Sequence, residues 1–480
     1  MKKSTLIEYL RKFTPKDIRE FGEFVHSPFF NKNQGVIKLY EYMRKQYPAF
    51  DASKLSKKDV FKKLFPKVAY SESFMKTLIH NLQKLVEDYL EYIGMKKHQF
   101  RGKIFLMTWL NEKELNSPIE RKMKELKKEL ERVRVRDEDY YYDKANIEIQ
   151  YFQYLTRATI HKREKFYKSG FSDEIAKDLT VYYLNYALQY YLFTYLVKRQ
   201  YDFVSKPGLI EDIIRILKPG DFEDVPLINL YYNLLMMYLK EDDVSYFYKA
   251  KSITGDYADQ LGDFNIKNAH INLCNYCIYK IDKDRKFVRE LFELIKFSLN
   301  KKLYIFPGQK EMDEVFYNMA VSIALRLKEY EWARKFIEEY KNELNQDYRE
   351  PAYYYSFALY EFTVKNFEKS LELVSRVKYT EVYQRAKLRV LACALYYELN
   401  MEEQFLSLID SFRHFLSHDK LLAPEIKQVF INFEKYTKAL NDVRNKNDVQ
   451  ELKTLKQKIQ SETALYNKEW ILEKIDELEK

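Results

Sequence analysis

Glycine and proline, the residues that build tight turns, are scarce in this chain. Its 480 residues include 10 glycines and 11 prolines, about 2% of each, whereas average usage is about 7% glycine and 5% proline. Strand-rich domains need residues with positive φ at many tight turns, and phosphate-binding loops need several glycines within a few positions. The sequence therefore predicts an all-α fold, and it contains no Walker A loop, dinucleotide-binding loop or G-x-S-x-G elbow.

The length and the hydrophobic content predict several helical domains or a repeat array. A chain of 480 residues exceeds the size at which one hydrophobic core stops growing, and 46% hydrophobic with 32% charged residues is a globular composition. Residues 179–197 carry no charge and could cross a bilayer by length, but six tyrosines are spread through their middle. We therefore expect a fully buried helix there and no membrane partner.

The cysteines and the first residues favour a cytoplasmic protein. Three cysteines, Cys274, Cys277 and Cys393, are too few for a disulfide framework, which favours a reducing compartment. Glu8 and Arg11 interrupt the apolar run that a secretory signal needs. We expect a first helix of a cytoplasmic protein in its place.

Charge is distributed unevenly along the chain. Residues 1–136 contain 31 Lys and Arg against 17 Asp and Glu, a net charge of +14, and the remainder contains 51 against 55, a net charge of −4. A basic segment favours an anionic partner, with nucleic acid as a candidate. The alternative is that these lysine-rich helices simply present solvated faces.

Helix-start signals predict several helices in the basic segment. A hydroxyl residue is followed three positions later by a carboxylate, the pattern of a capping box, at Thr14 with Asp17, Ser56 with Asp59, and Ser117 with Glu120. A longer helix is predicted over 71–93, with an apolar stripe of Phe74, Leu78, Leu82, Leu85, Tyr89 and Ile93.

A short helix from residue 57, a turn and the helix to residue 93 have the outline of a helix-turn-helix. The polar side of the second helix carries side chains able to contact bases or phosphates, Lys76, Thr77, His80, Asn81 and Lys84. The alternative is an ordinary amphipathic helix pair. We therefore predict a basic N-terminal helical module over 1–115, with a candidate helix-turn-helix at 57–93.

A heptad pattern follows the module. Ile119, Met123, Leu126, Leu130 and Val133 are spaced four, three, four and three residues apart. This seam covers fewer heptads than a sustained coiled coil needs. It predicts a long helix packed inside the chain and not a dimer zipper.

Helix pairs with small residues at matching positions recur in about 316–416. Ala358 and Ala392 lie thirty-four residues apart, and Ala333 and Ser370 occupy the same place in two helix starts, although Gln404 breaks the series. This region resembles the tetratricopeptide repeat family, whose thirty-four-residue helical hairpins place small residues at close contacts between helices. The resemblance implies a TPR-like α-solenoid over 116–480 that binds a protein or peptide.

The rest of the array and its binding face are predicted less specifically. Looser helix pairs are expected between 226 and 299, and two amphipathic helices over 449–479 are expected to cap the array. Some tyrosines should line a partner groove, because tyrosine offers a large contact area with few rotors. The candidates are Tyr354, Tyr355, Tyr396 and Tyr397.

Two groups have metal-ligand residue types at helical spacing. They are His270, Cys274 and Cys277 on one predicted helix and Asp410, His414 and His418 on another. A structural zinc site needs four ligands, and the first group offers three, so we interpret its cysteines as buried small hydrophobes. The second group lacks the glutamate of the H-E-x-x-H pattern that zinc proteases require. We expect no bound metal or cofactor, no catalytic residue and no small-molecule substrate.

Three hypotheses for function remain open from the sequence. The leading one is a non-catalytic cytoplasmic scaffold that binds a protein segment on a helical-repeat array. The second is a nucleic-acid-associated regulator that uses the basic module for contact and the array as a platform for partners. The third is an enzyme or metalloprotein whose site is assembled from distant side chains.

Overall fold

The described part of the chain is built from helices. The computed structural model describes residues 4–157, 164, 171–200, 208–217, 222–281, 284–305, 311–422, 424–446 and 448–479. Within these residues, the strand-like contact is one isolated bridge between Met312 and Leu344. The predicted all-α fold is confirmed. No helix among these residues has the length and apolar character needed to cross a membrane.

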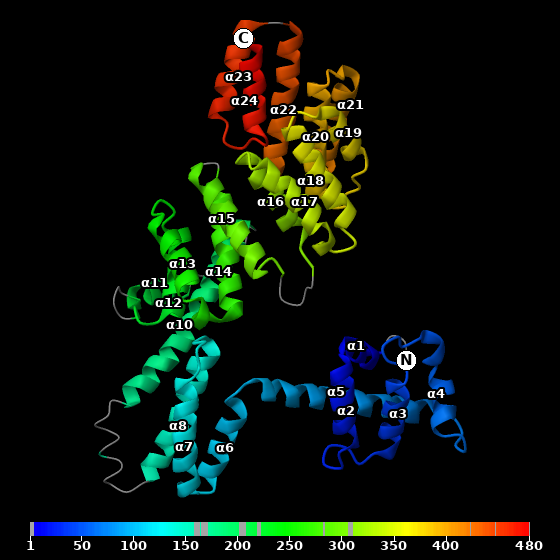
Figure 1. Cartoon of the computed structure of the whole chain (residues 1–480), viewed down its shortest axis with the longest axis vertical. Coiled ribbons are helices and arrows are strands. Elements are labelled where there is room, and N and C mark those ends of the chain that lie inside the picture. The colour runs from blue at the N-terminus through cyan, green and yellow to red at the C-terminus, as the bar shows by residue number, and fades with distance from the viewer. Residues whose placement is uncertain are drawn as a thin grey trace. The chain divides into compact units, whose positions relative to one another are not determined.

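The helices form two compact units, Met1–Ala187 and Leu188–Lys480. The boundary lies within α10 (Phe171–Gln200), whereas the sequence suggested a division after residue 115. Figure 1 labels the helices of both units. The first unit contains α1 (Thr5–Lys12), α2 (Pro15–His26), α3 (Gln34–Arg44), η1 (Ala52–Lys54), α4 (Lys57–Leu64), α5 (Glu72–Lys97), α6 (Arg101–Glu112), α7 (Asn116–Glu131), α8 (Glu138–Arg157) and the start of α10.

Capping explains where several of these helices begin. Thr14 and Asp17 form the predicted capping box, since the Asp17 amide donates to Thr14 Oγ1 at 3.2 Å and the Thr14 amide donates to Asp17 Oδ2 at 2.8 Å. The cap predicted at Ser117 is wrong. The Ile119 amide already donates to the Leu115 carbonyl, so α7 begins at Asn116 and Ser117 lies inside its first turn.

Helices α1 to α5 enclose the first hydrophobic core. The buried face of α5 differs from the predicted stripe, because Phe74 is 47% exposed and Met75 takes its place in the core. Phe74 packs edge-on against Phe61 and Phe65 at the rim of the core instead. The buried side chains of α5 are Met75, Leu78, Ile79, Leu82, Leu85, Val86 and Tyr89.

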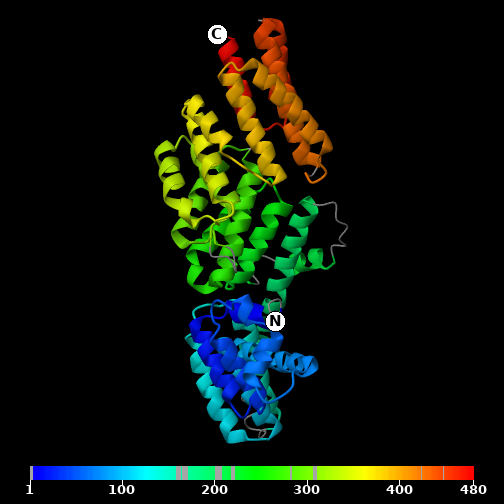
Figure 2. The same cartoon turned by 90° about the vertical axis from the view of Figure 1, so that its right-hand side faces the viewer.

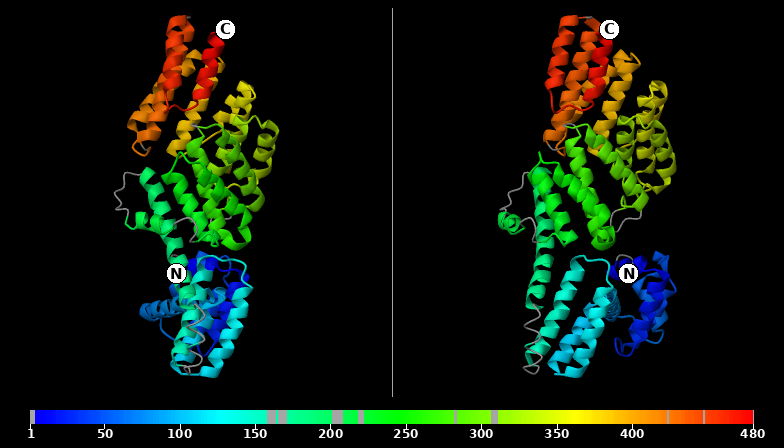
Figure 3. Two further views of the ribbon diagram at one scale, coloured as in Figure 1. Left: turned by 90° about the vertical axis from the view of Figure 1, so that its left-hand side faces the viewer. Right: turned by 60° about the vertical axis from the view of Figure 1, so that its left-hand side comes forward.

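Helices α6, α7 and α8 form a second core in the same unit, and each contacts the other two. Their ribbons run side by side in Figure 3. The heptad seam of α7 is buried there from Ile119 to Leu130, so the predicted packing within the chain is confirmed. The prediction of a fully buried helix at 179–197 is wrong, because Tyr183, Tyr190 and Phe193 of α10 are exposed. Only one side of that helix, which carries Val181, Leu184, Leu188 and Leu192, is buried.

The second unit continues with helices arranged in consecutive hairpins (Figure 2). They are α11 (Ile210–Ile216), α12 (Pro226–Leu239), α13 (Ser245–Asp256), α14 (Ala258–Lys280, kinked at Gly262), α15 (Lys286–Lys301), α16 (Glu314–Arg326), α17 (Tyr330–Tyr340), η2 (Lys341–Glu343), α18 (Arg349–Thr363), α19 (Phe367–Ser375), α20 (Val382–Glu398), α21 (Glu402–His418), α22 (Pro424–Lys446), α23 (Val449–Ser461) and α24 (Lys468–Leu478).

The contacts of this unit follow a regular rule. Each helix from α12 to α24 contacts the next one along the chain. From α16 onward, each even-numbered helix also contacts the next even-numbered helix, and α12 contacts α14. Among the described residues, successive odd-numbered helices make no comparable contacts. The even-numbered helices are therefore closer to one another than the odd-numbered helices are.

The same turn closes three successive hairpins. Lys328, Lys365 and Asn400 each take a left-handed conformation, with φ of 61°, 65° and 54°, directly after an even-numbered helix. In each turn the next amide donates to the carbonyl five residues earlier, which is the Schellman pattern. These bonds join Glu329 to Ala324, Asn366 to Glu361, and Met401 to Tyr396 at 2.8–2.9 Å.

Small residues allow close packing within these hairpins. Ala333, Ala358 and Ser370 are fully buried, and the Ser370 hydroxyl donates to the Ala358 carbonyl at 2.7 Å. Gln404 is exposed on α21, so that hairpin does not need a small residue at this position. The two predicted tail helices are present as α23 and α24, and they bury Leu452, Leu455, Ile459, Trp470, Ile471 and Ile475.

Candidate functional site

Four even-numbered helices place polar and aromatic side chains in one connected network. We call this network the even-helix face. It comprises Glu314 and Asn318 of α16, Tyr355 of α18, Tyr383 and Lys387 of α20, Phe430 of α22, and Tyr379, which lies just before α20. The helices that carry these residues contact one another in succession. The face therefore combines side chains from hairpins that are far apart in the sequence.

Hydrogen bonds fix the buried side of the face. The Ser356 hydroxyl donates to Asn318 Oδ1 at 2.8 Å, and Asn318 Nδ2 donates to the Tyr379 hydroxyl at 3.3 Å. Asn318 and Ser356 are both buried. Buried amides with both ends bonded hold a single orientation, so Tyr379 is held in a defined position.

Aromatic contacts extend the network across the helices. The rings of Tyr355 and Tyr379 meet edge-on with centroids 5.8 Å apart, and Tyr383 meets Phe430 at the same distance. Burial raises the pKa of the Tyr355, Tyr379 and Tyr383 hydroxyls. Tyrosine hydroxyls are protonated at neutral pH even without this shift, so these three can donate hydrogen bonds.

Lys387 lies over two of these rings. Its Nζ is 5.2 Å from the centroid of Tyr355 and 5.7 Å from that of Tyr383. Desolvation lowers the pKa of Lys387 to about 8, although the charge of Glu314 opposes the shift. Burial likewise raises the pKa of Glu314, whose Oε2 is buried without a hydrogen-bond partner. The face thus offers an amine and a carboxyl group that are both incompletely solvated.

Part of the face remains open to solvent. Tyr383 is 43% exposed, and Lys387 is half-buried. Tyr355 and Phe430 are buried beneath this opening. The exposed ring of Tyr383, with its hydroxyl donor beside an amine, suits recognition of a polypeptide, because it supplies both apolar contact area and a directional bond.

Of the four predicted partner-groove tyrosines, the structure places only Tyr355 on the even-helix face. Tyr354 turns toward Tyr353 and the cation of Arg376. Tyr397 is buried against Phe405 and Trp470, and Tyr396 is half-buried beside that core.

The helix-turn-helix candidates lie on α5, whose N-terminal part contacts α4. Lys76, Thr77, His80 and Lys84 are exposed, and Asn81 is half-buried. Lys76 pairs with Glu72 at 3.7 Å, and the Thr77 hydroxyl donates to the Ser73 carbonyl. The predicted nucleic-acid surface is thus accessible, with one of its cations engaged by a carboxylate.

The metal candidates on α14 are packed into the interior. All three cysteines of the chain are free and buried. This burial agrees with their interpretation as small hydrophobic residues. His270 Nε2 lies 3.5 Å from Cys274 Sγ, and burial lowers the pKa of His270 to about 4 and raises the pKa of Cys274 to about 12. Burial also raises the pKa of Cys277. A neutral thiol is a poor metal ligand.

The candidates on α21 are exposed and turn to other partners. Asp410 lies 3.5 Å from Arg413, and His418 Nδ1 lies 2.9 Å from the His414 carbonyl. Within the described residues, no group of three or more metal-binding side chains converges.

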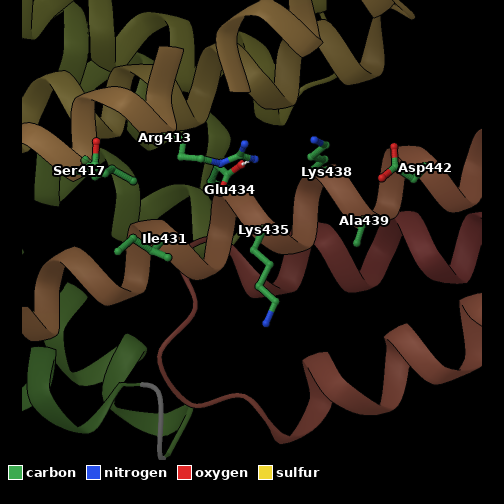
Figure 4. A pocket seen from close by; sticks show the side chains of 9 residues that line it. Arg413, Ser417, Ile431, Glu434, Lys435, Lys438, Ala439 and Asp442 are labelled. Carbon is green, nitrogen blue, oxygen red and sulfur yellow. Dashed lines mark hydrogen bonds and ion pairs between the residues drawn. The ribbon is translucent and has the colours of Figure 1, made fainter. Parts of the chain in front are cut away.

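A surface pocket of about 470 Å³ lies between α21 and α22. Figure 4 shows Arg413 reaching to Glu434 across it, while Lys435 points away. The Arg413–Glu434 ion pair neutralises two of the charges that line this pocket. A second pocket, of about 620 Å³, is lined by α12 and α13, including Tyr232 and Tyr246.

Sequence reasoning missed every residue of the face except Tyr355, namely Glu314, Asn318, Tyr379, Tyr383, Lys387 and Phe430. A pattern that could have indicated two of them is Tyr383 with Lys387, which lie one helical turn apart near the start of α20. The chain matches no protein-family model, no curated protein and no solved structure.

Proposed function

We propose that Leu188–Lys480 is a tetratricopeptide-like helical-repeat array and that the even-helix face binds a segment of another protein. On this proposal the chain is a non-catalytic cytoplasmic scaffold. Three successive hairpins with one turn geometry and buried small residues support the repeat assignment. The free, buried cysteines fit a reducing compartment.

The contact rule indicates which side of the array would receive a partner. From α16 onward, even-numbered helices touch their even-numbered neighbours, and the odd-numbered helices among the described residues do not to a comparable extent. In a curved stack, the more closely spaced helices lie on the inner side. The even-helix face is therefore the concave side of the proposed array, the side on which extended ligands find the largest contact area.

The observation that carries the proposal is the convergence of Tyr355, Tyr383 and Lys387 from consecutive even-numbered helices. Such a cluster supplies aromatic surface, hydroxyl donors and a cation at one place. Aromatic residues that are well surrounded by protein dominate the energy of peptide recognition.

Selection of peptides from a random display library tests the proposal. We expect selected peptides to bind the full chain with micromolar affinity and to lose at least tenfold in affinity on Tyr383→Ala or Lys387→Glu. Tyr354→Ala is the matched control, because Tyr354 lies outside the face, and it should leave binding unchanged. Failure to select any peptide, or peptides indifferent to both Tyr383→Ala and Lys387→Glu, would refute the assignment.

The charge of the first unit favours a second candidate function, in which the basic module contacts nucleic acid. Residues 1–136 carry a net charge of +14, and α5 exposes Lys76 and Lys84. If these lysines contact phosphates, affinity for duplex DNA or RNA falls steeply as salt rises, and Lys76→Glu with Lys84→Glu reduces the salt slope. Absence of binding at 50 mM salt would remove this candidate.

A further inference from the structure

A non-helical segment of the chain lies against the even-helix face. Residues Glu462–Asn467 join α23 to α24, and the segment is held by its backbone to α22. Asn432 Nδ2 donates to the Ala464 carbonyl at 2.8 Å, and the Tyr466 amide donates to the Val429 carbonyl at 3.4 Å. Helix α22 thus holds a stretch of irregular backbone by one side-chain amide and one main-chain bond.

The side chain of Tyr466 completes the aromatic network. Its ring stacks on Phe430 with centroids 5.2 Å apart, and Phe430 in turn meets Tyr383. The hydroxyl of Tyr466 interacts with that of Tyr355, and the positive charge of Arg326 lies near enough to influence it. Tyr466 therefore joins α18, α20 and α22 through one phenol ring.

Helix α24 holds the segment in place through Glu398 at the end of α20. Trp470 Nε1 donates to Glu398 Oε1 at 2.7 Å, and Lys474 Nζ lies 3.0 Å from the same carboxylate. Two outer ion pairs, Arg285–Glu469 and Lys365–Glu473, are exposed and contribute little. Trp470, Ile471 and Ile475 bury this side of α24 in the core, and the inner contacts with Glu398 are its main polar attachment to α20.

We propose that Glu462–Asn467 is an intramolecular occupant of the binding face and that the partner presents a non-helical segment whose tyrosine replaces Tyr466. This inference rests on the proposed function and specifies its ligand. The contacts made by the segment are those that a bound peptide would make: a carbonyl held by Asn432, an amide bonded to α22, and an aromatic ring in the subsite of Tyr355, Tyr383 and Phe430.

Occupancy by the chain's own segment lowers the apparent affinity for a partner. A ligand that binds only the open form has an affinity reduced by the fraction of molecules that are open. Removing the tyrosine ring, or weakening the contacts with Glu398, raises that fraction. Both changes should therefore tighten binding of an external tyrosine peptide.

The test uses the full chain and an end-blocked synthetic peptide with the sequence of residues 461–468. By titration calorimetry we expect Tyr466→Ala to bind this peptide at least tenfold more tightly than the wild-type chain does. The same peptide with alanine in place of its tyrosine should lose this gain. Tyr466→Phe keeps the ring and should bind as weakly as the wild type.

Tyr317→Ala is the matched control, because Tyr317 is a fully buried tyrosine of α16 whose hydroxyl bonds the Ile337 carbonyl outside the subsite. It should gain no peptide affinity. If circular dichroism shows that Tyr466→Ala is unfolded, Glu398→Gln carries the test, and it should tighten binding at least threefold. No gain in the folded variant would overturn the inference.

The outcomes separate this inference from the proposed function. If library peptides depend on Tyr383 and Lys387 but neither Tyr466→Ala nor Glu398→Gln gains affinity for the tyrosine peptide, the face binds partners and the segment is not a competitor. If the alanine peptide binds Tyr466→Ala as tightly as the tyrosine peptide does, the aromatic subsite is refuted.

Discussion

Replacing Glu148 with glutamine should stabilise the first unit at high pH and leave it unchanged at low pH. Glu148 of α8 is buried, and its Oε2 has no hydrogen-bond partner. Burial raises the pKa of its carboxyl from the usual value near 4.5 to about 7, and the facing charges of Asp178 and Glu174 on α10 add to the shift. Lys144 on α8 and Lys127 on α7 oppose it, and Lys144 pairs with Asp178 at 2.8 Å.

The sign and the size of this change in the free energy of unfolding follow from proton binding. Between about pH 4.5 and pH 7 the unfolded chain releases this proton and the folded chain keeps it, so stability falls as pH rises. One unit of pKa shift corresponds to about 1.4 kcal/mol, and the full shift therefore removes about 3 kcal/mol above pH 7. Glutamine has the same shape and does not ionise. The gap between Glu148→Gln and the wild type should therefore grow from near zero at pH 4 to about 3 kcal/mol at pH 8.

Native-state hydrogen exchange of the α8 amides measures this gap, because the free energy of local opening can be compared at each pH after correction for intrinsic exchange rates. The buried carboxylates Asp143 and Asp178 also titrate, so each comparison is made between variant and wild type at one pH. A gap that is the same at pH 4.5 and pH 8, or a variant less stable at pH 8, would refute the reasoning.

Three further predictions concern local structure. Lys328→Gly and Lys365→Gly should each raise the free energy of unfolding by about 1 kcal/mol in denaturant titration, because both lysines hold left-handed conformations; no gain relative to Lys→Ala would contradict this. Thr14→Ala should cost about 1 kcal/mol through loss of the capping box, whereas Ser117→Ala should stay within about 0.5 kcal/mol, and equal costs would show that the caps are misassigned. The three cysteines should resist a thiol reagent until the chain unfolds, because burial raises their pKa values, so stoichiometric labelling of the native protein would contradict their burial.

Local signals in the sequence predicted much of the helical structure. The scarcity of glycine and proline indicated the all-α fold, and Thr14 with Asp17 identified a helix start that the structure confirms. The heptad residues of α7 also pack as expected. These features succeed because each depends on residues within one or two helical turns of one another.

Features that depend on neighbouring elements were not predictable in the same way. Ser117 fits a cap pattern, but α7 already begins at Asn116, with Leu115 at the N-cap. Lys328, Lys365 and Asn400 fill turn positions that usually take glycine, so the turns carried no glycine signal. Whether one side of α10 is exposed depends on how many neighbouring helices cover it. A run of uncharged residues in the sequence does not reveal that number.

The candidate site was the least predictable part, because its residues come from α16, α18, α20, α22 and the segment before α24. Tyrosine pairs were the sequence signal, and adjacent tyrosines on a helix point in different directions. Tyr354 and Tyr355 therefore separate, and only Tyr355 reaches the face. Tyr383 and Tyr466 are brought to Phe430 by the packing of separate hairpins.

Site-specific photo-crosslinking tests most directly whether the even-helix face binds a partner segment. A photoreactive phenylalanine analogue is placed at position 383 of the full chain, and at position 354 as the control, and each protein is irradiated with a peptide selected from the library. The account predicts a crosslinked peptide at position 383 and none at position 354. A crosslink at position 354 alone, or the absence of a crosslink at position 383 with a peptide that binds, would contradict it.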